Sequence, residues 1–152
     1  MLDQDACRHL FGNILRFRAT PSTGAHFLVS ECTTMPGAGT PPKRHPGDDE
    51  GFYILEGHYE FIVEGKTIEA GPGDWVGIPN GAQHQFRNAT TEVARMLIVN
   101  APGRLHEAYY AKLGELLPEG TTQAPAPSGP PSAPARAEMH RCAAACGVEL
   151  LV

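Results

Sequence analysis

Short apolar runs separated by turn residues fill the chain from Gly24 to Pro102. Within one run, Tyr59 to Val63, every second residue is aromatic or aliphatic, which predicts a strand with one buried face. Gly, Pro and Asn end the runs, with tight turns expected at Glu56-Gly57, Glu64-Gly65 and Asn80-Gly81. No helical period is sustained here. The pattern predicts an all-β sandwich or barrel made from AHFLVSECT, GFYILEG, HYEFIVEG, KTIEAG, DWVGIP, HQFRN and ARMLIVNAP.

The segments on either side of this barrel have different patterns. Residues 1–23 are weakly patterned and fit a short helix or an edge strand packed on the barrel. Residues 103–117 predict an amphipathic helix, and residues 118–137 predict an extended, proline-rich strap. Residues 138–152 return to helix-forming side chains, and we expect this C-terminal helix and tail to dock on the barrel.

Composition narrows the classes of partner. The chain has 152 residues, a formal net charge of −5 and no basic stripe, so one domain is expected and nucleic acid is not an expected partner. An apolar run long enough to span a membrane is absent, and the first residues do not resemble a secretory signal, so we expect a cytoplasmic protein. Of the four cysteines, none forms a C-x-x-C pair, and Cys32 fits a small core residue.

Three side chains stand out as candidate metal ligands. His45 precedes Glu50 by five residues, and His84 follows the turn at Asn80-Gly81. Two imidazoles and one carboxylate form the set that holds non-haem Fe(II) while leaving positions open, and the same set binds Mn, Ni or Zn. Such an ion polarises a substrate or activates dioxygen, and a barrel interior excludes bulk water around it.

The residues around these ligands resemble the two motifs of the cupin family. The first, G-x5-H-x-H-x(3,4)-E-x6-G, compares with GTPPKRHPGDDEGFYILEG, and the second, G-x5-P-x-G-x2-H-x3-N, with GDWVGIPNGAQHQFRN. The second motif is matched at every fixed position. The resemblance implies a double-stranded β-helix, or jelly roll, with short C-terminal helices. It also implies that His45, Glu50 and His84 bind a divalent metal beside a small-molecule ligand, in a protein that forms a homodimer.

One position departs from the motif. Lys43 stands where the family has its first histidine, and it shares a strand face with His45, so it should point to the same interior. A protonated lysine cannot coordinate a metal. Either three ligands suffice, and Lys43 is displaced, anchors an anionic substrate or acts as an acid or base, or else Lys43 pairs with Glu50 and takes the ion's place.

Alternation along the strands gives a candidate ligand pocket. Phe52, Ile54 and Phe86 share faces with the predicted ligands, although all three also fit ordinary core positions. We expect His58 and His106 to be surface residues. The H-x-C-x3-C pattern of residues 140–146 lacks a fourth ligand and the usual zinc spacing, and is not expected to bind zinc.

These residues are compatible with three hypotheses for function. The first is a metal-dependent enzyme, an oxygenase or a related lyase or isomerase, in which Lys43 orients an anionic substrate or transfers a proton. The second is a non-catalytic small-molecule-binding or sensor barrel with a degenerate, metal-free site. The third is a metal-free enzyme of the sugar-epimerase kind, with His84 as the base.

Overall fold

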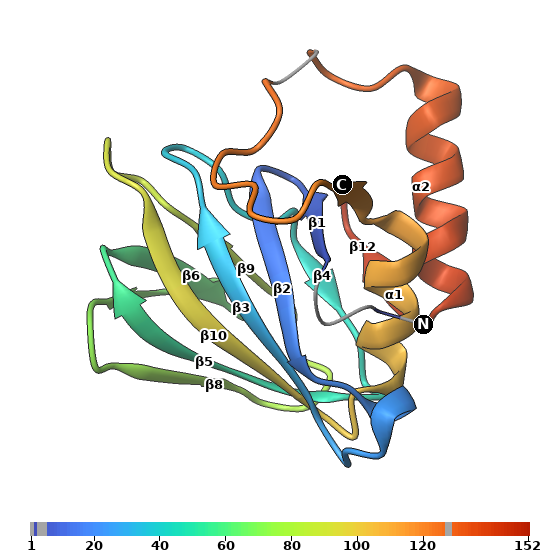
Figure 1. Cartoon of the computed structure of the whole chain (residues 1–152), viewed down its shortest axis with the longest axis horizontal. Helices are drawn as coiled ribbons and strands as arrows, with labels where there is room; N and C mark the ends of the chain where they lie inside the picture. Colours follow the sequence, from blue (N-terminus) through green and yellow to red (C-terminus); the bar gives the residue numbers. More distant parts are fainter. Residues whose placement is uncertain (1, 3–5, 127–128) are drawn as a thin grey trace.

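The computed structural model describes residue 2 and residues 6–126 and 129–152. Two antiparallel sheets face each other and enclose the core (Figure 1). One sheet has seven strands, ordered β11 (Glu115–Leu117), β1 (Cys7–Leu10), β2 (Asn13–Ala19), β3 (Leu28–Thr34), β10 (Ala94–Ala101), β5 (Asp49–Glu56) and β8 (Trp75–Ile78). The other has five, ordered β12 (Glu149–Leu150), β4 (Lys43–Arg44), β9 (His84–Arg87), β6 (Tyr59–Val63) and β7 (Lys66–Ala70).

Strand alternation produces the core as the sequence predicts. The pattern of β10 is strictly buried then half-buried, and Tyr59, Phe61 and Val63 of β6 point inward. The Tyr59 and Phe61 rings contact Phe86 on the neighbouring strand β9, and the Phe61 and Phe86 rings contact Phe52 on β5 of the facing sheet. Cys32 is fully buried, which confirms it as a core residue. The predicted all-β jelly-roll class is therefore confirmed.

The hairpin between β6 and β7 shows how the turns fix this register. Glu64 and Gly65 both have positive φ, 49° and 77°, as a two-residue hairpin turn requires. Val63 consequently pairs with Lys66, and the ladder continues to Tyr59 opposite Ala70. The apolar face of β6 is therefore held toward the core.

The flanking segments differ in part from the expectation. Residues 1–23 contain β1, β2 and a short 3-10 helix (Pro21–Thr23), and β2 is an integral strand of the larger sheet. The helix expected over residues 103–117 ends early: α1 spans Arg104–Leu113, and β11 follows it because its backbone pairs with β1. Propensity alone does not reveal that pairing.

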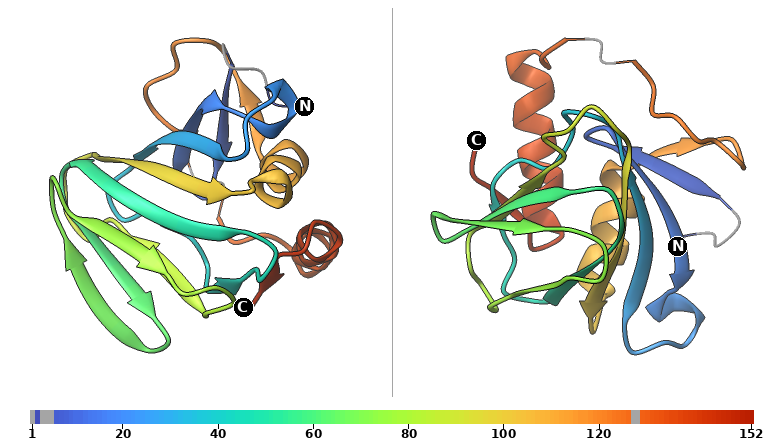
Figure 2. Two further views of the ribbon diagram at one scale, coloured as in Figure 1. Left: turned by 90° about the horizontal axis from the view of Figure 1, so that it is seen from below. Right: turned by 90° about the vertical axis from the view of Figure 1, so that its left-hand side faces the viewer.

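The C-terminal segment returns to the body of the molecule. Helix α2 (Ala133–Ala145) begins inside the expected strap and packs on α1, and β12 pairs with β4 (Figure 2). Ala143, Val148 and Leu150 are buried there. Among the described helices, none is long and apolar enough to cross a membrane.

Candidate metal centre

The three predicted ligands meet between the two sheets. His45 follows β4, Glu50 lies on β5 and His84 begins β9, and each is at most 6% exposed. Glu50 Oε1 lies 3.0 Å from His45 Nε2 and 2.8 Å from His84 Nε2. The two Nε2 atoms are 3.1 Å apart. The fold therefore brings together three side chains that are up to 39 residues apart in sequence.

The hydrogen bonds of the imidazoles fix which nitrogen carries the proton. His45 Nδ1 faces the Asp48 carbonyl oxygen at 3.3 Å, and His84 Nδ1 faces the Ala82 carbonyl oxygen at 2.9 Å. A carbonyl oxygen only accepts, so each Nδ1 carries a proton and donates it, and in the neutral ring Nε2 keeps the lone pair. The lone pairs of His45 and His84 thus converge on the carboxylate oxygen of Glu50.

Such an arrangement fits a cation. Three acceptor atoms within hydrogen-bond distance of one another repel unless a proton or a positive ion lies among them. Protonating both rings would place two imidazolium cations 3.1 Å apart beside Lys43. A divalent metal satisfies all three atoms at once, and backbone carbonyl groups that hold Nδ1 are the usual supports of histidine ligands.

Glu50 is held as an anion. Burial alone would raise the pKa of its carboxyl, but the Lys43 ammonium, followed by His106 and the adjacent imidazoles of His45 and His84, keeps the pKa well below its ordinary value. Its second oxygen, Oε2, accepts a hydrogen bond of 2.9 Å from the side-chain amide of Asn100 on the neighbouring strand. The carboxylate is therefore charged and fixed in orientation.

The prediction that His106 is a surface residue was wrong. Its side chain is fully buried, and His45, Glu50 and His106 offer ligand atoms that lie within 4.8 Å of one another. Burial lowers the pKa of His106 to about 4, against the opposing effects of Glu50 and Asp48. A signal was present: His106, Tyr109, Tyr110 and Leu113 recur at helical spacing, so the histidine lies on the apolar stripe of α1.

Lys43 is buried in the same interior, as its strand position predicts. Its ammonium lies 5.4 Å from the centre of the Tyr109 ring, within range of a cation–π interaction. Among the described residues, no carboxylate oxygen lies within 4.0 Å of it, so the pairing of Lys43 with Glu50 considered from sequence is not formed. The charge instead faces a small internal cavity.

That cavity holds about 20 Å³, roughly one water molecule. Phe52, Phe86, Lys43 and Glu50 line it, whereas Ile54 packs in the core away from it. Phe11, Thr40 and Phe86 line both this cavity and an open groove of about 650 Å³ on the surface. These shared side chains therefore lie between the cavity and the groove.

Two facing antiparallel sheets with a histidine–carboxylate cluster between them define a small β-barrel protein with a candidate metal site. The chain belongs to the cupin family. The cupin domain matches residues 30–100, and an uncharacterised protein of Aquifex aeolicus is 38% identical over 89 residues, 59% of this chain and 68% of that one.

Two further relatives have named activities. Quercetin 2,3-dioxygenase of Bacillus subtilis is 29% identical over 97 residues, which cover 64% of this chain but only 28% of the dioxygenase. The solved structure of the polyketide cyclase RemF from Streptomyces resistomycificus is 28% identical, with a TM-score of 0.55 over 67% of this chain and 70% of the cyclase.

Proposed function

We propose that this cupin binds a divalent transition metal through His45, Glu50 and His84 and uses it on a small organic anion. The convergence of three lone-pair atoms inside the barrel carries this proposal. Fe, Mn, Ni or Zn suits two imidazoles and a carboxylate. When bound, the metal supplies Lewis-acid polarisation of a ligand oxygen and, for iron, reactivity toward dioxygen.

The chain's own side chains give the ligand its place. The Lys43 ammonium, free of any carboxylate within 4.0 Å in the described part of the chain, attracts and orients an anionic oxygen. Phe52 and Phe86 provide apolar walls and exclude water. A cavity of about 20 Å³ admits a substrate only after side chains move, and Phe11, Thr40 and Phe86 are placed to do so from the groove side.

Oxygenase chemistry is the reaction class that we favour, because a relative with a named activity is a dioxygenase. The second candidate is a non-oxidative cyclisation or isomerisation, favoured by the structural similarity to a cyclase. Both use the same polarised ligand oxygen, and they differ in whether dioxygen is consumed. We also propose that the protein forms a homodimer.

Metal content is the first test. Protein purified without chelators, and protein reconstituted with each ion in turn, should hold close to one equivalent by elemental analysis. Occupancy below about 0.1 equivalent for all four metals would exclude the metal centre, since a built site retains its ion without chelators.

Oxygen uptake separates the reaction classes. Fe(II)-loaded protein should consume dioxygen in an oxygen electrode when ascorbate, catechol or acetylacetone is supplied as the enolic probe. Conversion of a probe without oxygen uptake would support the non-oxidative class. Binding of a probe without conversion, measured by calorimetry, would support the sensor alternative.

A further inference from the structure

Lys43 occupies the position of the first histidine in the first cupin motif, and another histidine, His106, lies close to His45 and Glu50. We infer that His106 of helix α1 takes the coordinating role of the histidine replaced by Lys43, and that Asp48 positions it. This inference rests on the proposed metal centre and adds a ligand that lies outside both motifs.

The free nitrogen of His106 carries the first part of the argument. His106 Nε2 is buried, has no hydrogen-bond partner in the described part of the chain, and lies 3.5 Å from Glu50 Oε2. The His106 ring packs edge-on against the His45 ring, with centroids 4.3 Å apart. An unpartnered buried nitrogen is costly, so one aimed at a ligand carboxylate points to a missing partner there.

Asp48 determines the state of the other nitrogen. Its Oδ2 accepts a hydrogen bond of 2.9 Å from His106 Nδ1, which leaves the lone pair on Nε2. A carboxylate behind a histidine is the support that orients metal-bound imidazoles. Although burial opposes it, hydrogen bonds from His106 and Gly103 keep the pKa of Asp48 below its ordinary value.

Asp48 also anchors helix α1 to the loop between His45 and Glu50. Asp48 Oδ1 and Oδ2 accept the backbone N–H groups of Gly103 and His106, at 2.9 and 3.0 Å. Gly103 has φ of 89°, and a Cβ on it would lie 2.6 Å from the Leu28 nitrogen, so glycine is required where the chain enters the helix. The backbone carbonyl of Asp48 meanwhile faces His45. One residue thus positions two imidazoles.

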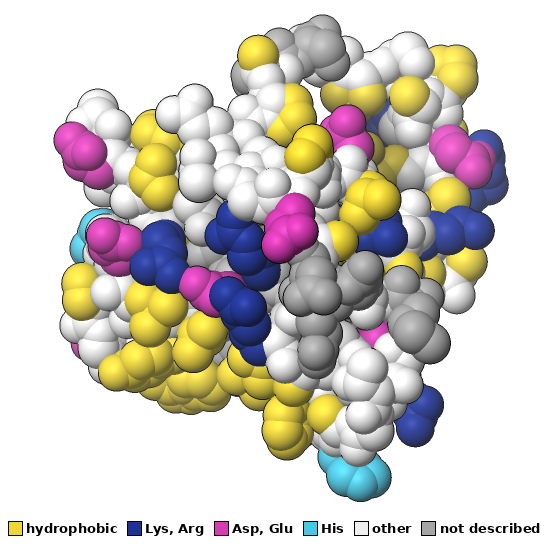
Figure 3. Space-filling view, viewed as in Figure 1, with side chains coloured by type: hydrophobic (Ala, Val, Ile, Leu, Met, Phe, Trp, Pro, Cys, Tyr) yellow, Lys and Arg dark blue, Asp and Glu magenta, His cyan; other side chains and the backbone are white. Residues whose placement is uncertain are grey.

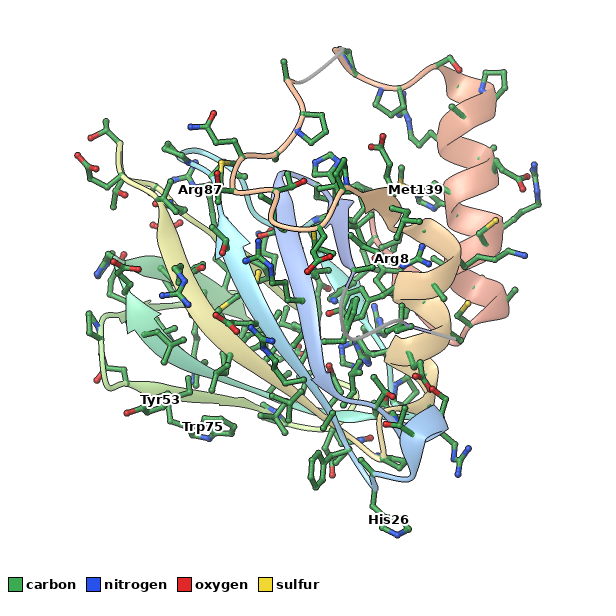
Figure 4. The ribbon with its side chains drawn as sticks, in the orientation of Figure 1. Arg8, His26, Tyr53, Trp75, Arg87 and Met139 are labelled. Carbon is green, nitrogen blue, oxygen red and sulfur yellow. The ribbon has the colours of Figure 1, made fainter. Side chains whose placement is uncertain are left out.

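Binding of Co²⁺ to chelator-stripped protein tests the inference. The variant His106→Ala should bind Co²⁺ more than about 100-fold more weakly, a larger loss than the 10- to 100-fold expected of Asp48→Asn, because it removes a ligand and not its support. His26→Ala is the matched control, since His26 is exposed and projects away from the molecule (Figure 4), and its affinity should be unchanged.

A second change separates coordination from folding. Adding Lys43→His to His106→Ala restores a histidine at the family position, and we expect it to regain at least about tenfold in affinity. A His106→Ala variant that is folded by circular dichroism and binds Co²⁺ as tightly as the wild type would overturn the inference.

Paramagnetic NMR of the wild-type Co²⁺ protein gives a measurement without substitution. Each histidine bound through Nε2 keeps an exchangeable Nδ1–H with a strongly shifted resonance, so we expect three such signals. Two signals would overturn the role of His106 and leave the proposed function intact. Failure of the wild type to bind Co²⁺ at all would remove both.

Discussion

The barrel and the C-terminal segment place histidines at the same centre by different means. His45, Glu50 and His84 lie on or beside strands, where alternation and fixed turns determine which way each side chain points. His106 lies on a helix that follows the last long strand, and it reaches the centre only because α1 docks on the loop carrying Asp48. A ligand on a strand is thus set by local register, and a ligand on a helix is set by tertiary packing.

Neutralising the Glu50 carboxylate should have the largest effect on metal affinity. We expect Glu50→Gln to weaken Co²⁺ binding by well over about 100-fold, since it removes the anionic ligand that every nearby histidine faces. Calorimetric titration of stripped protein gives the constant, with Glu56→Gln on the same strand as an exposed control. Equal affinity for Glu50→Gln and the wild type would mean that the centre does not use this carboxylate.

Deletion of the C-terminal segment tests how much this segment contributes to the stability of the barrel. Deleting residues 121–152 removes the buried side chains of Val148 and Leu150, worth roughly 1.5–3 kcal/mol each, and uncovers one side of α1. At about 2–4 °C per kcal/mol, the melting temperature should fall by at least roughly 6 °C. Deleting Val152 alone, which is 63% exposed, is the control.

The melting temperature and the Co²⁺ affinity of the truncated protein together show what the C-terminal segment contributes. A lower melting temperature with Co²⁺ affinity nearly kept would show that Asp48 alone suffices to seat α1. An unchanged melting temperature would mean that the tail contributes nothing to the fold, contrary to its pairing with β4.

The two regions also differ in what their sequence reveals. Both cupin motifs, the β6–β7 hairpin and the inward face of β6 follow from spacing and turn residues, so the fold and three candidate ligands are predictable. The position of His106 is not predictable in this way. No local pattern indicates that the apolar stripe of α1 packs against the ligand cluster, because even the nearest of those ligands in sequence, His84, is far from the helix. The strand β11 was missed for the same reason, since its partner β1 lies over 100 residues away.

Lys43 should contribute more to the affinity for an organic anion than to the affinity for the metal. We expect Lys43→Met to leave Co²⁺ affinity unchanged or slightly tighter, because a buried positive charge near the cation is removed. Affinity of the loaded protein for an anionic probe such as ascorbate should fall about tenfold, the equivalent of one charge-assisted hydrogen bond. Calorimetry on both steps measures the difference. A large loss of metal affinity would place Lys43 among the groups that build the centre.

The outer face of the barrel should have the smallest effect on the centre. Tyr53 and Trp75 are 41% and 57% exposed and lie together on the outside of β5 and β8, where Figures 3 and 4 show an apolar area.

If a second copy binds there, Trp75→Glu should raise the dimer dissociation constant, measured by sedimentation, at least about tenfold, as expected of a central tryptophan. Co²⁺ affinity should not change, because Trp75 covers Gly51 on the side opposite the ligands. Leu116→Glu, equally exposed but on β11, is the control. A change in metal affinity for Trp75→Glu would show that the sheet transmits changes from its outer face to the centre. The view that local strand register alone sets His45, Glu50 and His84 would then be wrong.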